Sequence, residues 1–315
     1  MTTATERRDA LVQRLFEATL GTWDLLAVYL GSRLGLYRAL AEGDATTSEL
    51  AERTETNERY VREWLEQQAS SGILDVDDPA AEAGTRRYSL PAGHDEALLD
   101  EASLNFIAPI AKLVAACVQP LEELLEAFRT GEGIPYSAYG VDLHQGQAEF
   151  TRPMFETQLG SEWLPAIPEV HARLQADPPA RVADVACGEG FSTIAIARAY
   201  PKARVDGIDS DASSIAAAEG HLVGSGVEER VRFQPRDAAE IEGERYDLVY
   251  IHEALHDMSY PVEVLHTCRG LLADGGSVVI GGRAGRRRLH GARERHRAPV
   301  LQLQHPPLPA GRDGR

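Results

Sequence analysis

The feature that most constrains the fold is a regular alternation of apolar and amphipathic segments in the second half of the chain. Five short apolar runs are typical of buried strands, and they cover residues 181–186, 203–209, 231–237, 247–252 and 276–281. Segments with helical periodicity separate them. This alternation predicts an α/β fold: a Rossmann-like, mostly parallel sheet with helices on both faces. Such sheets bind ligands at the carboxyl ends of their strands.

A turn rich in small residues, ADVACGEGFS, follows the first of these strands at residues 183–192. Gly188 and Gly190 lack a Cβ atom, so the turn can be tight and a ligand can lie against the backbone. A helix begins directly after the turn, and its free N–H groups favour the anionic end of a ligand. The turn therefore predicts a site for a ligand that carries a carboxylate or a phosphate.

Two acidic residues at the ends of later strands narrow the class of ligand. Asp209 ends the second strand, where a carboxylate can accept both hydroxyl groups of a ribose. Asp237 ends the third strand, where its carboxylate or the N–H of Ala238 can meet the edge of a purine. The ligand is therefore expected to be a nucleoside. NAD fits poorly, because Thr193 stands at the third small position of its G-x-G-x-x-G/A fingerprint.

The order of these features resembles that of the class I S-adenosylmethionine-dependent methyltransferases. Residues 184–190 match the acid-x-small-x-Gly-x-Gly pattern of motif I, with Ala186 in place of the first glycine. Asp209 and Asp237 match the ribose-side and adenine-side acids, and the likeness covers residues 178–282. It implies S-adenosylmethionine as the cofactor. The cofactor site implied by the resemblance consists of Asp184, Ala186, Gly188, Gly190, Asp209, Asp237 and Ala238.

The segment YDLVYIHEALHDM, residues 246–258, resembles the region of the fourth strand in small-molecule O-methyltransferases with an N-terminal winged-helix dimerisation domain. In those relatives the histidine of the His-Asp pair is the general base, which implies this role for His256 if the acceptor is a hydroxyl. A neutral imidazole with a pKa of about 6.5 suits the task. A helix-capping or surface histidine is the alternative. The resemblance also makes His252 a candidate cofactor contact.

Residues 1–92 have the pattern of a helical winged-helix domain. Apolar residues recur at three- and four-residue spacing along residues 7–42, which predicts two amphipathic helices. Thr47 or Ser48 is expected to cap a further helix. Two short strands are expected within residues 72–76 and 86–90.

This domain is expected to pair two subunits rather than to bind DNA. Between Glu49 and Asp75 the sequence has seven acidic residues against three arginines, which disfavours an approach to phosphates. We therefore expect a homodimer formed largely by residues 1–110 and no nucleic-acid partner. A DNA-binding regulator that uses the methyltransferase fold as a ligand sensor is the alternative function. A cofactor-binding scaffold without catalysis is a third.

Residues 93–175 are predicted to form a helical linker that contributes to the substrate pocket, and residues 176–282 to form the cofactor-binding domain. The linker contains four aromatic residues that are candidates for lining a pocket or for packing between domains: Tyr136, Tyr139, Phe150 and Phe155. The acceptor is expected to be a small molecule.

Composition indicates a cytoplasmic protein. The three cysteines are widely spaced and odd in number, as in a reduced protein without a disulfide frame. No group of His, Cys, Asp and Glu has metal-ligand spacing, so no metal is expected. The N-terminus lacks the apolar core of a signal peptide. The most apolar stretch, residues 106–118, is interrupted by Pro109 and Lys112 and is too short to span a bilayer.

The last part of the chain departs from the rest. The net charge is −17, yet residues 281–315 contain nine arginines against Glu294 and Asp313. We expect residues 283–315 to be a disordered basic tail read out of frame, with a nucleic-acid-binding tail as the alternative. The C-terminal strands that follow the fifth strand in the resembled family would then be missing. The fifth strand would keep an exposed edge.

Overall fold

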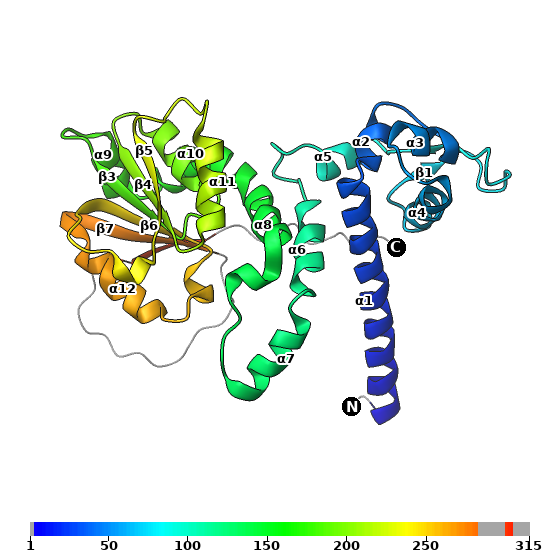
Figure 1. Ribbon diagram of the computed structural model, residues 1–315, viewed down its shortest axis with the longest axis horizontal. Coiled ribbons are helices and arrows are strands. Elements are labelled where there is room, and N and C mark those ends of the chain that lie inside the picture. The colour runs from blue at the N-terminus through cyan, green and yellow to red at the C-terminus, as the bar shows by residue number, and fades with distance from the viewer. Residues whose placement is uncertain (1–2, 283–299, 305–315) are drawn as a thin grey trace. The chain divides into compact units, whose positions relative to one another are not determined.

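The computed structural model describes residues 3–282 and 300–304 (Figure 1). The chain divides into two compact units, Met1–Pro153 and Met154–Arg315. The N-terminal unit is mainly helical, and the C-terminal unit contains a parallel sheet. The segment predicted as a linker, residues 93–175, contributes to both units.

The N-terminal unit begins with a long helix, α1 (Ala4–Arg33), which starts at a capping box between Thr3 and Glu6. Its other elements follow in this order: α2 (Leu36–Ala41), α3 (Thr47–Arg53), α4 (Glu58–Ser70), β1 (Asp75–Val76), β2 (Tyr88–Ser89), α5 (His94–Leu98), α6 (Pro109–Cys117), α7 (Leu121–Thr130), the 3-10 helix η1 (Tyr136–Tyr139) and α8 (Gly140–Met154).

The core of this unit joins the end of α1 to the winged helix. The rings of Tyr37 and Trp64 meet edge to face at 5.1 Å, and Trp64 Nε1 donates a 2.8 Å hydrogen bond to the carbonyl of Ala27. Gly31 allows the close approach, because a Cβ atom there would lie 2.5 Å from both rings. Only the C-terminal part of α1 therefore packs into the core of the N-terminal unit.

The predicted helix cap is wrong by one residue. The Oγ1 of Thr46, rather than a side chain at position 47 or 48, accepts a hydrogen bond from the N–H of Glu49. The Glu49 carboxylate accepts one from the N–H of Thr46 at 2.9 Å, which completes a capping box. The two predicted strands are present but short: β1 and β2 have two residues each and pair in antiparallel register.

The C-terminal unit contains a sheet with the strand order β5-β4-β3-β6-β7-β8, in which every neighbouring pair is parallel. The strands are β3 (Arg181–Val185), β4 (Arg204–Asp209), β5 (Val231–Pro235), β6 (Tyr246–His252), β7 (Leu272–Gly282) and β8 (Val300–Gln304). This confirms the predicted α/β, Rossmann-like sheet. Strand order reverses at β3, which pairs with both β4 and β6.

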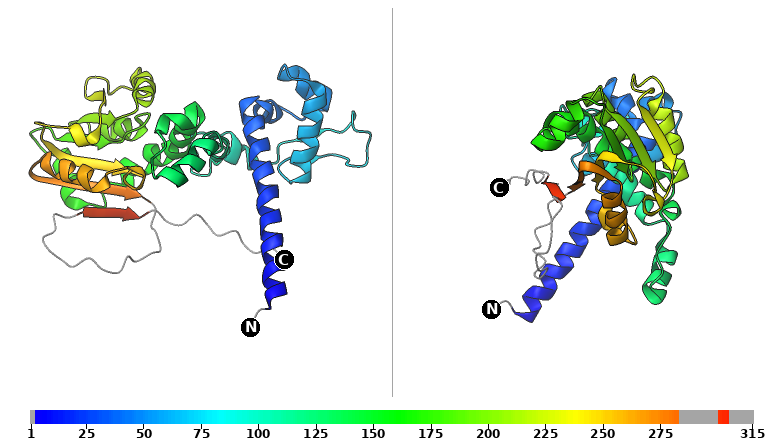
Figure 2. Two further views of the ribbon diagram at one scale, coloured as in Figure 1. Left: turned by 60° about the horizontal axis from the view of Figure 1, so that its bottom comes forward. Right: turned by 90° about the vertical axis from the view of Figure 1, so that its left-hand side faces the viewer.

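Helices cover both faces of the sheet (Figure 2). One face packs against a π-helix labelled η2 (Phe155–Trp163), α9 (Pro168–Gln175), α10 (Phe191–Ala199) and α11 (Ala212–Leu222). The other packs against α12 (Pro261–Gly270) and, beside it, the 3-10 turns η3 (Ala238–Glu240) and η4 (Leu255–Asp257). Both faces of β3 and β6 are therefore buried, as their continuous apolar sequence predicts.

The expectation that the last strand of the sheet, β7, keeps an exposed edge is wrong, because one parallel strand pairs with it. Val278 of β7 pairs with Val300 of β8, and the ladder continues to Gly282 and Gln304. The run VLQLQ contains apolar and polar residues in near alternation, which suits a strand at a sheet edge. The edge of β7 is therefore paired. The proposed change of reading frame and the rest of the predicted basic tail, residues 283–299 and 305–315, lie outside the described residues.

Candidate cofactor and catalytic site

The carboxyl end of β3 holds a buried acidic residue, Asp184, which is 1% exposed. Ser192 and Thr193, at the start of α10, each donate a 2.6 Å hydroxyl hydrogen bond to its Oδ2. Burial raises the pKa of Asp184 to about 6, although the two hydroxyl groups oppose the rise. Asp184 therefore fixes the start of α10 to β3. Its direct contact with a cofactor stays a prediction.

The turn after β3 contains three residues in the left-handed region. The φ angle is +58° at Ala186, +52° at Gly188 and +82° at Gly190. A Cβ atom at Gly190 would lie 2.5 Å from the ring of Phe233 and 2.9 Å from the Cβ of Ala218, so the turn packs too closely for any side chain. A Cβ atom at Gly188 would meet no described atom within 4 Å. Gly190 therefore serves packing, whereas Gly188 faces open space that a ligand can enter.

Asp209 ends β4 beside this turn. The N–H of Gly188 donates a 2.8 Å hydrogen bond to its Oδ2, and the N–H of Asp211 donates a 2.9 Å bond to its Oδ1. These two amides fix the orientation of the carboxylate, which as an acceptor of about four hydrogen bonds suits a diol such as ribose. The turn and Asp209 therefore fit the nucleoside ligand that the sequence predicts.

Asp237 follows β5 and caps the short helix η3. Its Oδ1 accepts a 2.8 Å hydrogen bond from the N–H of Ala239, its side chain is exposed, and Ala238 is half-buried. Because β5 neighbours β4, this capped turn lies on the same side of β3 as Asp209. The roles of Asp237 and Ala238 at an adenine ring stay predictions.

His252, the last residue of β6, is 8% exposed and lies among aromatic rings. Its ring stacks on Trp163 at 5.2 Å and meets Phe155 edge to face at 4.9 Å. The Tyr250 hydroxyl is hydrogen-bonded to His252 Nδ1 at 2.8 Å. The His252 ring is thus part of a packed aromatic cluster, and a cofactor contact by this residue stays a prediction.

Sequence reasoning missed this cluster, because no local pattern indicates a π-helix. The π-helix η2 places Phe155 and Trp163 on the sheet. Gly160 allows η2 to approach α10, since a Cβ atom there would lie 2.3 Å from the Cβ of Ala199. A glycine within an otherwise helical stretch is the one signal that could have indicated this close packing.

His256 and Asp257 lie in η4, directly after β6. Their side chains are 63% and 70% exposed, and His256 Nε2 lies 3.5 Å from Asp257 Oδ1. An exposed imidazole at the carboxyl edge of the sheet can take a proton from a ligand and release it to water. Cys187, in the turn, is unsuited to such chemistry, because burial raises its pKa well above the usual value for a thiol.

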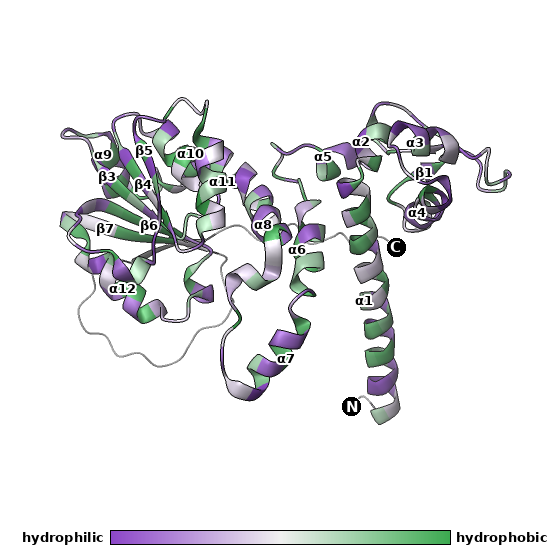
Figure 3. Ribbon diagram, viewed as in Figure 1, coloured by the Kyte–Doolittle hydropathy of each residue, from purple (hydrophilic) through white to green (hydrophobic). Residues whose placement is uncertain are grey.

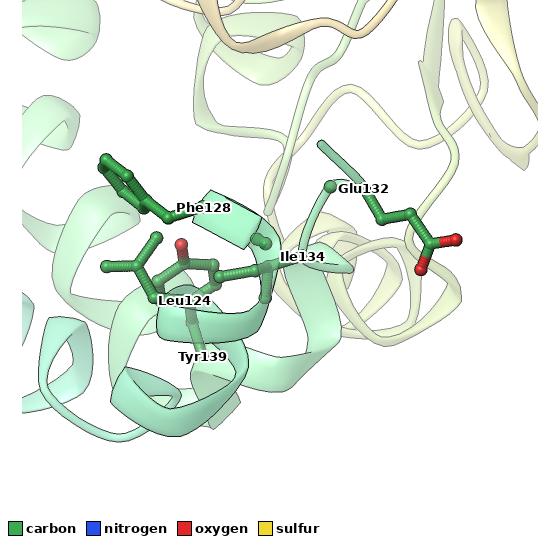
Figure 4. A pocket seen from close by; sticks show the side chains of 7 residues that line it. Leu124, Phe128, Glu132, Ile134 and Tyr139 are labelled. Carbon is green, nitrogen blue, oxygen red and sulfur yellow. The ribbon is translucent and has the colours of Figure 1, made fainter. Parts of the chain in front are cut away.

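Three of the four aromatic candidates of residues 93–175 have different neighbours within their own units. Tyr139 lines a hollow of about 430 Å³ in the N-terminal unit with Leu124, Phe128 and Ile134 (Figure 4). Tyr136 stacks on His144, at 4.3 Å between ring centroids. Phe155 instead belongs to the cluster around His252 in the C-terminal unit.

Two features bear on metals and membranes. Within residues 3–282, no group of three or more His, Cys, Asp and Glu side chains could hold a metal ion. No helix in the described part of the chain is both long and apolar enough to cross a bilayer.

The fold is that of an α/β protein, and the turn after β3 together with Asp209 has a geometry that fits a nucleoside cofactor. A family model described as a methyltransferase domain matches residues 183–278, and a model described as an Rv2258c-like winged HTH domain matches residues 24–100. The chain is a class I S-adenosylmethionine-dependent methyltransferase with an N-terminal winged-helix domain. Its cofactor is S-adenosylmethionine.

Relatives of known activity agree with this class. The mitomycin biosynthesis 6-O-methyltransferase of Streptomyces lavendulae is 28% identical over 260 residues, which are 80% of this chain and 71% of that protein. The 3-amino-4-hydroxybenzoate 4-O-methyltransferase of Streptomyces cremeus is 28% identical over 284 residues, which are 86% of this chain and 73% of that protein.

Solved structures show the same fold. A mitomycin 7-O-methyltransferase aligns with a TM-score of 0.65 at 22% identity, over 88% of this chain and 81% of that chain. Human N-acetylserotonin methyltransferase, solved in complex with S-adenosylmethionine, aligns with a TM-score of 0.59 at 17% identity, over 89% and 81%.

Proposed function

We propose that this protein methylates a hydroxyl group on a small aromatic molecule, with His256 as the general base. The observation that carries the proposal is the exposed His256–Asp257 pair directly after β6, at the edge where Asp209 and the Gly188 turn also lie. The two curated relatives named above are O-methyltransferases, which supports oxygen as the methylated atom.

S-adenosylmethionine, when bound, supplies a methyl group that is already activated on a sulfonium. The chain's own residues then have two tasks. The Gly188 turn and Asp209 hold and orient the nucleoside, so that the donor has a fixed position. His256 takes the proton of the acceptor hydroxyl as the oxygen becomes nucleophilic, and Asp257 Oδ1 lies 3.5 Å from its Nε2.

The experiment measures turnover and cofactor affinity separately, with 3-amino-4-hydroxybenzoate and related phenols as acceptors and mass spectrometry of the products. We expect His256→Ala to lower kcat by about 100-fold or more, because general bases contribute that much. Its cofactor Kd should stay within about twofold of wild type. Asp209→Ala should raise the cofactor Kd by about tenfold or more, because charged hydrogen bonds are lost.

His266→Ala is the matched control, because His266 is an exposed histidine of α12 away from the strand ends. It should leave both quantities unchanged. If His256→Ala retains wild-type kcat while the wild type is active, His256 is not the base. If the wild type binds cofactor but turns over no acceptor, the scaffold alternative is favoured.

We further propose that the N-terminal unit forms a homodimer through α1, and that the protein works in the reducing cytoplasm. Large apolar side chains of α1, including Phe16 and Trp23, are 59% and 62% exposed, which supports an unfilled interface. All three cysteines are free, which supports a reducing compartment.

A DNA-binding regulator is not favoured. Arg53 donates to the carbonyl of Gly43 at 2.6 Å and to that of Asp44 at 3.2 Å. Arg59 is paired with Glu63 on its own helix. Two of the three arginines between Glu49 and Asp75 are therefore already engaged, among an excess of acidic residues.

A further inference from the structure

Glu253, the residue after β6, has an unfavourable backbone conformation. Its φ angle is +50°, in the left-handed region that residues with a Cβ atom avoid. Among the described residues only Glu55 and Ala186 share this feature outside glycine. The N–H of Glu253 donates a 2.9 Å hydrogen bond to the carbonyl of Gly281, so the surrounding sheet holds the strained backbone in place.

The Glu253 side chain is also unfavourably placed. Its Oε1 is buried and has no hydrogen-bond partner among the residues that the structure describes. This oxygen lies over the end of β7, since a Cβ atom at Gly282 would be 3.7 Å from it. A buried carboxylate oxygen without a donor is destabilising. Two unfavourable features thus coincide at one residue of the ligand-binding edge.

Glu253 lies at the carboxyl edge of the sheet, on the β6 side of β3. Asp209 and Asp237 end β4 and β5, on one side of β3. Glu253 and His256 follow β6, on the other side of β3, and the Glu253 carboxylate reaches toward β7. Glu253 is therefore on the side of the proposed base, away from the acids that fit the nucleoside.

We propose that Glu253 positions the methyl acceptor by accepting a hydrogen bond from a second donor group on it. This inference rests on the proposed function. Because Glu253 and His256 are separated by only two residues along the chain after β6, we expect the second donor to lie near the hydroxyl that is methylated. The favoured acceptors are therefore phenols with a neighbouring amino or hydroxyl group. Binding such a donor would satisfy the buried oxygen.

The test compares two acceptors that differ only in that second donor, 3-amino-4-hydroxybenzoate and 4-hydroxybenzoate, at saturating S-adenosylmethionine. We expect the wild type to have a KM at least about tenfold lower for the amino compound, as loss of one charged hydrogen bond implies. Glu253→Gln and Glu253→Gly should remove most of this preference. Their kcat for 4-hydroxybenzoate and their cofactor Kd should stay near wild type, which a general structural defect would not allow.

Melting temperature gives a readout that does not depend on turnover. Glu253→Gly relieves the left-handed backbone and removes the buried oxygen, so Tm should rise by about 2–4 °C. Glu55→Gly is the matched control, because Glu55 has a φ angle of +52° in a turn of the N-terminal unit. It should give a smaller rise and leave the preference between acceptors intact.

Three results would overturn the role of Glu253. One is equal KM values for the two acceptors in the wild type. Another is a preference that survives in Glu253→Gly. The third is a Tm gain for Glu253→Gly no larger than that for Glu55→Gly. If the wild type methylates neither compound, the proposed function fails for these acceptors, and the Tm comparison alone decides whether Glu253 is a strained, unsatisfied site.

Discussion

The two units of the chain differ in how completely they bury their apolar residues. In the described part of the C-terminal unit, the large apolar side chains that remain exposed are Val223, Tyr260 and Val262. In the N-terminal unit, α1 alone exposes seven: Leu11, Val12, Leu15, Phe16, Leu20, Trp23 and Leu30. Figure 3 shows hydrophobic residues in the enclosed strands of the sheet and also along α1. The described part of the C-terminal unit therefore buries nearly all of its large apolar side chains, whereas α1 of the N-terminal unit leaves an apolar surface exposed.

The helix α7 extends the same contrast. It is amphipathic, yet none of its residues is buried, and Phe128 is 85% exposed. Burying apolar area is worth roughly 25 cal/mol per Å². A helix that leaves its apolar face in water therefore gains little from its own unit. Substitutions in the sheet are therefore expected to affect folding, whereas substitutions on α1 are expected to affect assembly.

The largest effect is expected at Gly190. Gly190→Ala places a methyl group 2.5 Å from the Phe233 ring at a φ angle of +82°, so overpacking and backbone strain combine. We expect the free energy of unfolding to fall by about 3 kcal/mol or more, as measured by urea denaturation. The matched variant is Gly188→Ala, whose methyl group enters open space. It should cost only about 1 kcal/mol but weaken cofactor binding. Equal losses of stability would contradict the division of roles between the two glycines.

A second prediction concerns pH and the buried carboxyl group of Asp184. Its pKa is about 6 in the folded state against 3.8 for the ordinary group, so between these pH values the folded state binds more protons than the unfolded state. The contribution of Asp184 to the free energy of unfolding is therefore fully present below about pH 4. It should fall by on the order of 3 kcal/mol as the pH rises through about 6. Asp184→Asn has no proton to lose. Urea denaturation from pH 4 to 8 should show that the free energy of unfolding of the variant, relative to that of the wild type, rises with pH up to about pH 6. If the free energies of unfolding of the two proteins change in parallel with pH, the raised pKa of Asp184 is refuted.

The third prediction addresses the apolar surface of α1. Trp23→Glu places a charge on this surface, and we expect the dimer Kd to rise by about 100-fold, equivalent to about 2.7 kcal/mol. Analytical ultracentrifugation at micromolar concentration should show a dimeric wild type and a monomeric variant. Tyr60→Glu is the control, because Tyr60 is 78% exposed on α4, outside this surface, and should leave the dimer intact. A wild type that sediments as a monomer would remove the basis of the contrast between the two units.

Local chemistry explains which parts of the molecule could be predicted from the sequence. Strand alternation and the glycine turn depend on neighbouring residues, so the parallel sheet and the place of Asp209 at a strand end near the turn follow from short patterns. The cluster around His252 depends on the distant Trp163, so no short pattern indicates it. The strand β8 was missed because a run of five residues carries too weak a signal against its Arg- and Pro-rich surroundings.

The smallest effect is expected at Ala186, where the resembled family has glycine. Ala186 has a φ angle of +58°, and an alanine in the left-handed region costs roughly 1–2 kcal/mol. Glycine removes that cost but gains freedom in the unfolded chain, so Ala186→Gly should stabilise the protein by only about 0.5 kcal/mol. Ala216→Gly is a control of opposite sign, because Ala216 is an exposed residue inside α11, where glycine should cost about 1 kcal/mol. Urea denaturation of both variants should show a higher free energy of unfolding for Ala186→Gly and a lower one for Ala216→Gly. A loss of stability at Ala186 would mean that the turn does not hold this residue in the left-handed region, and that the cofactor unit is less rigid at its edge than its buried core implies.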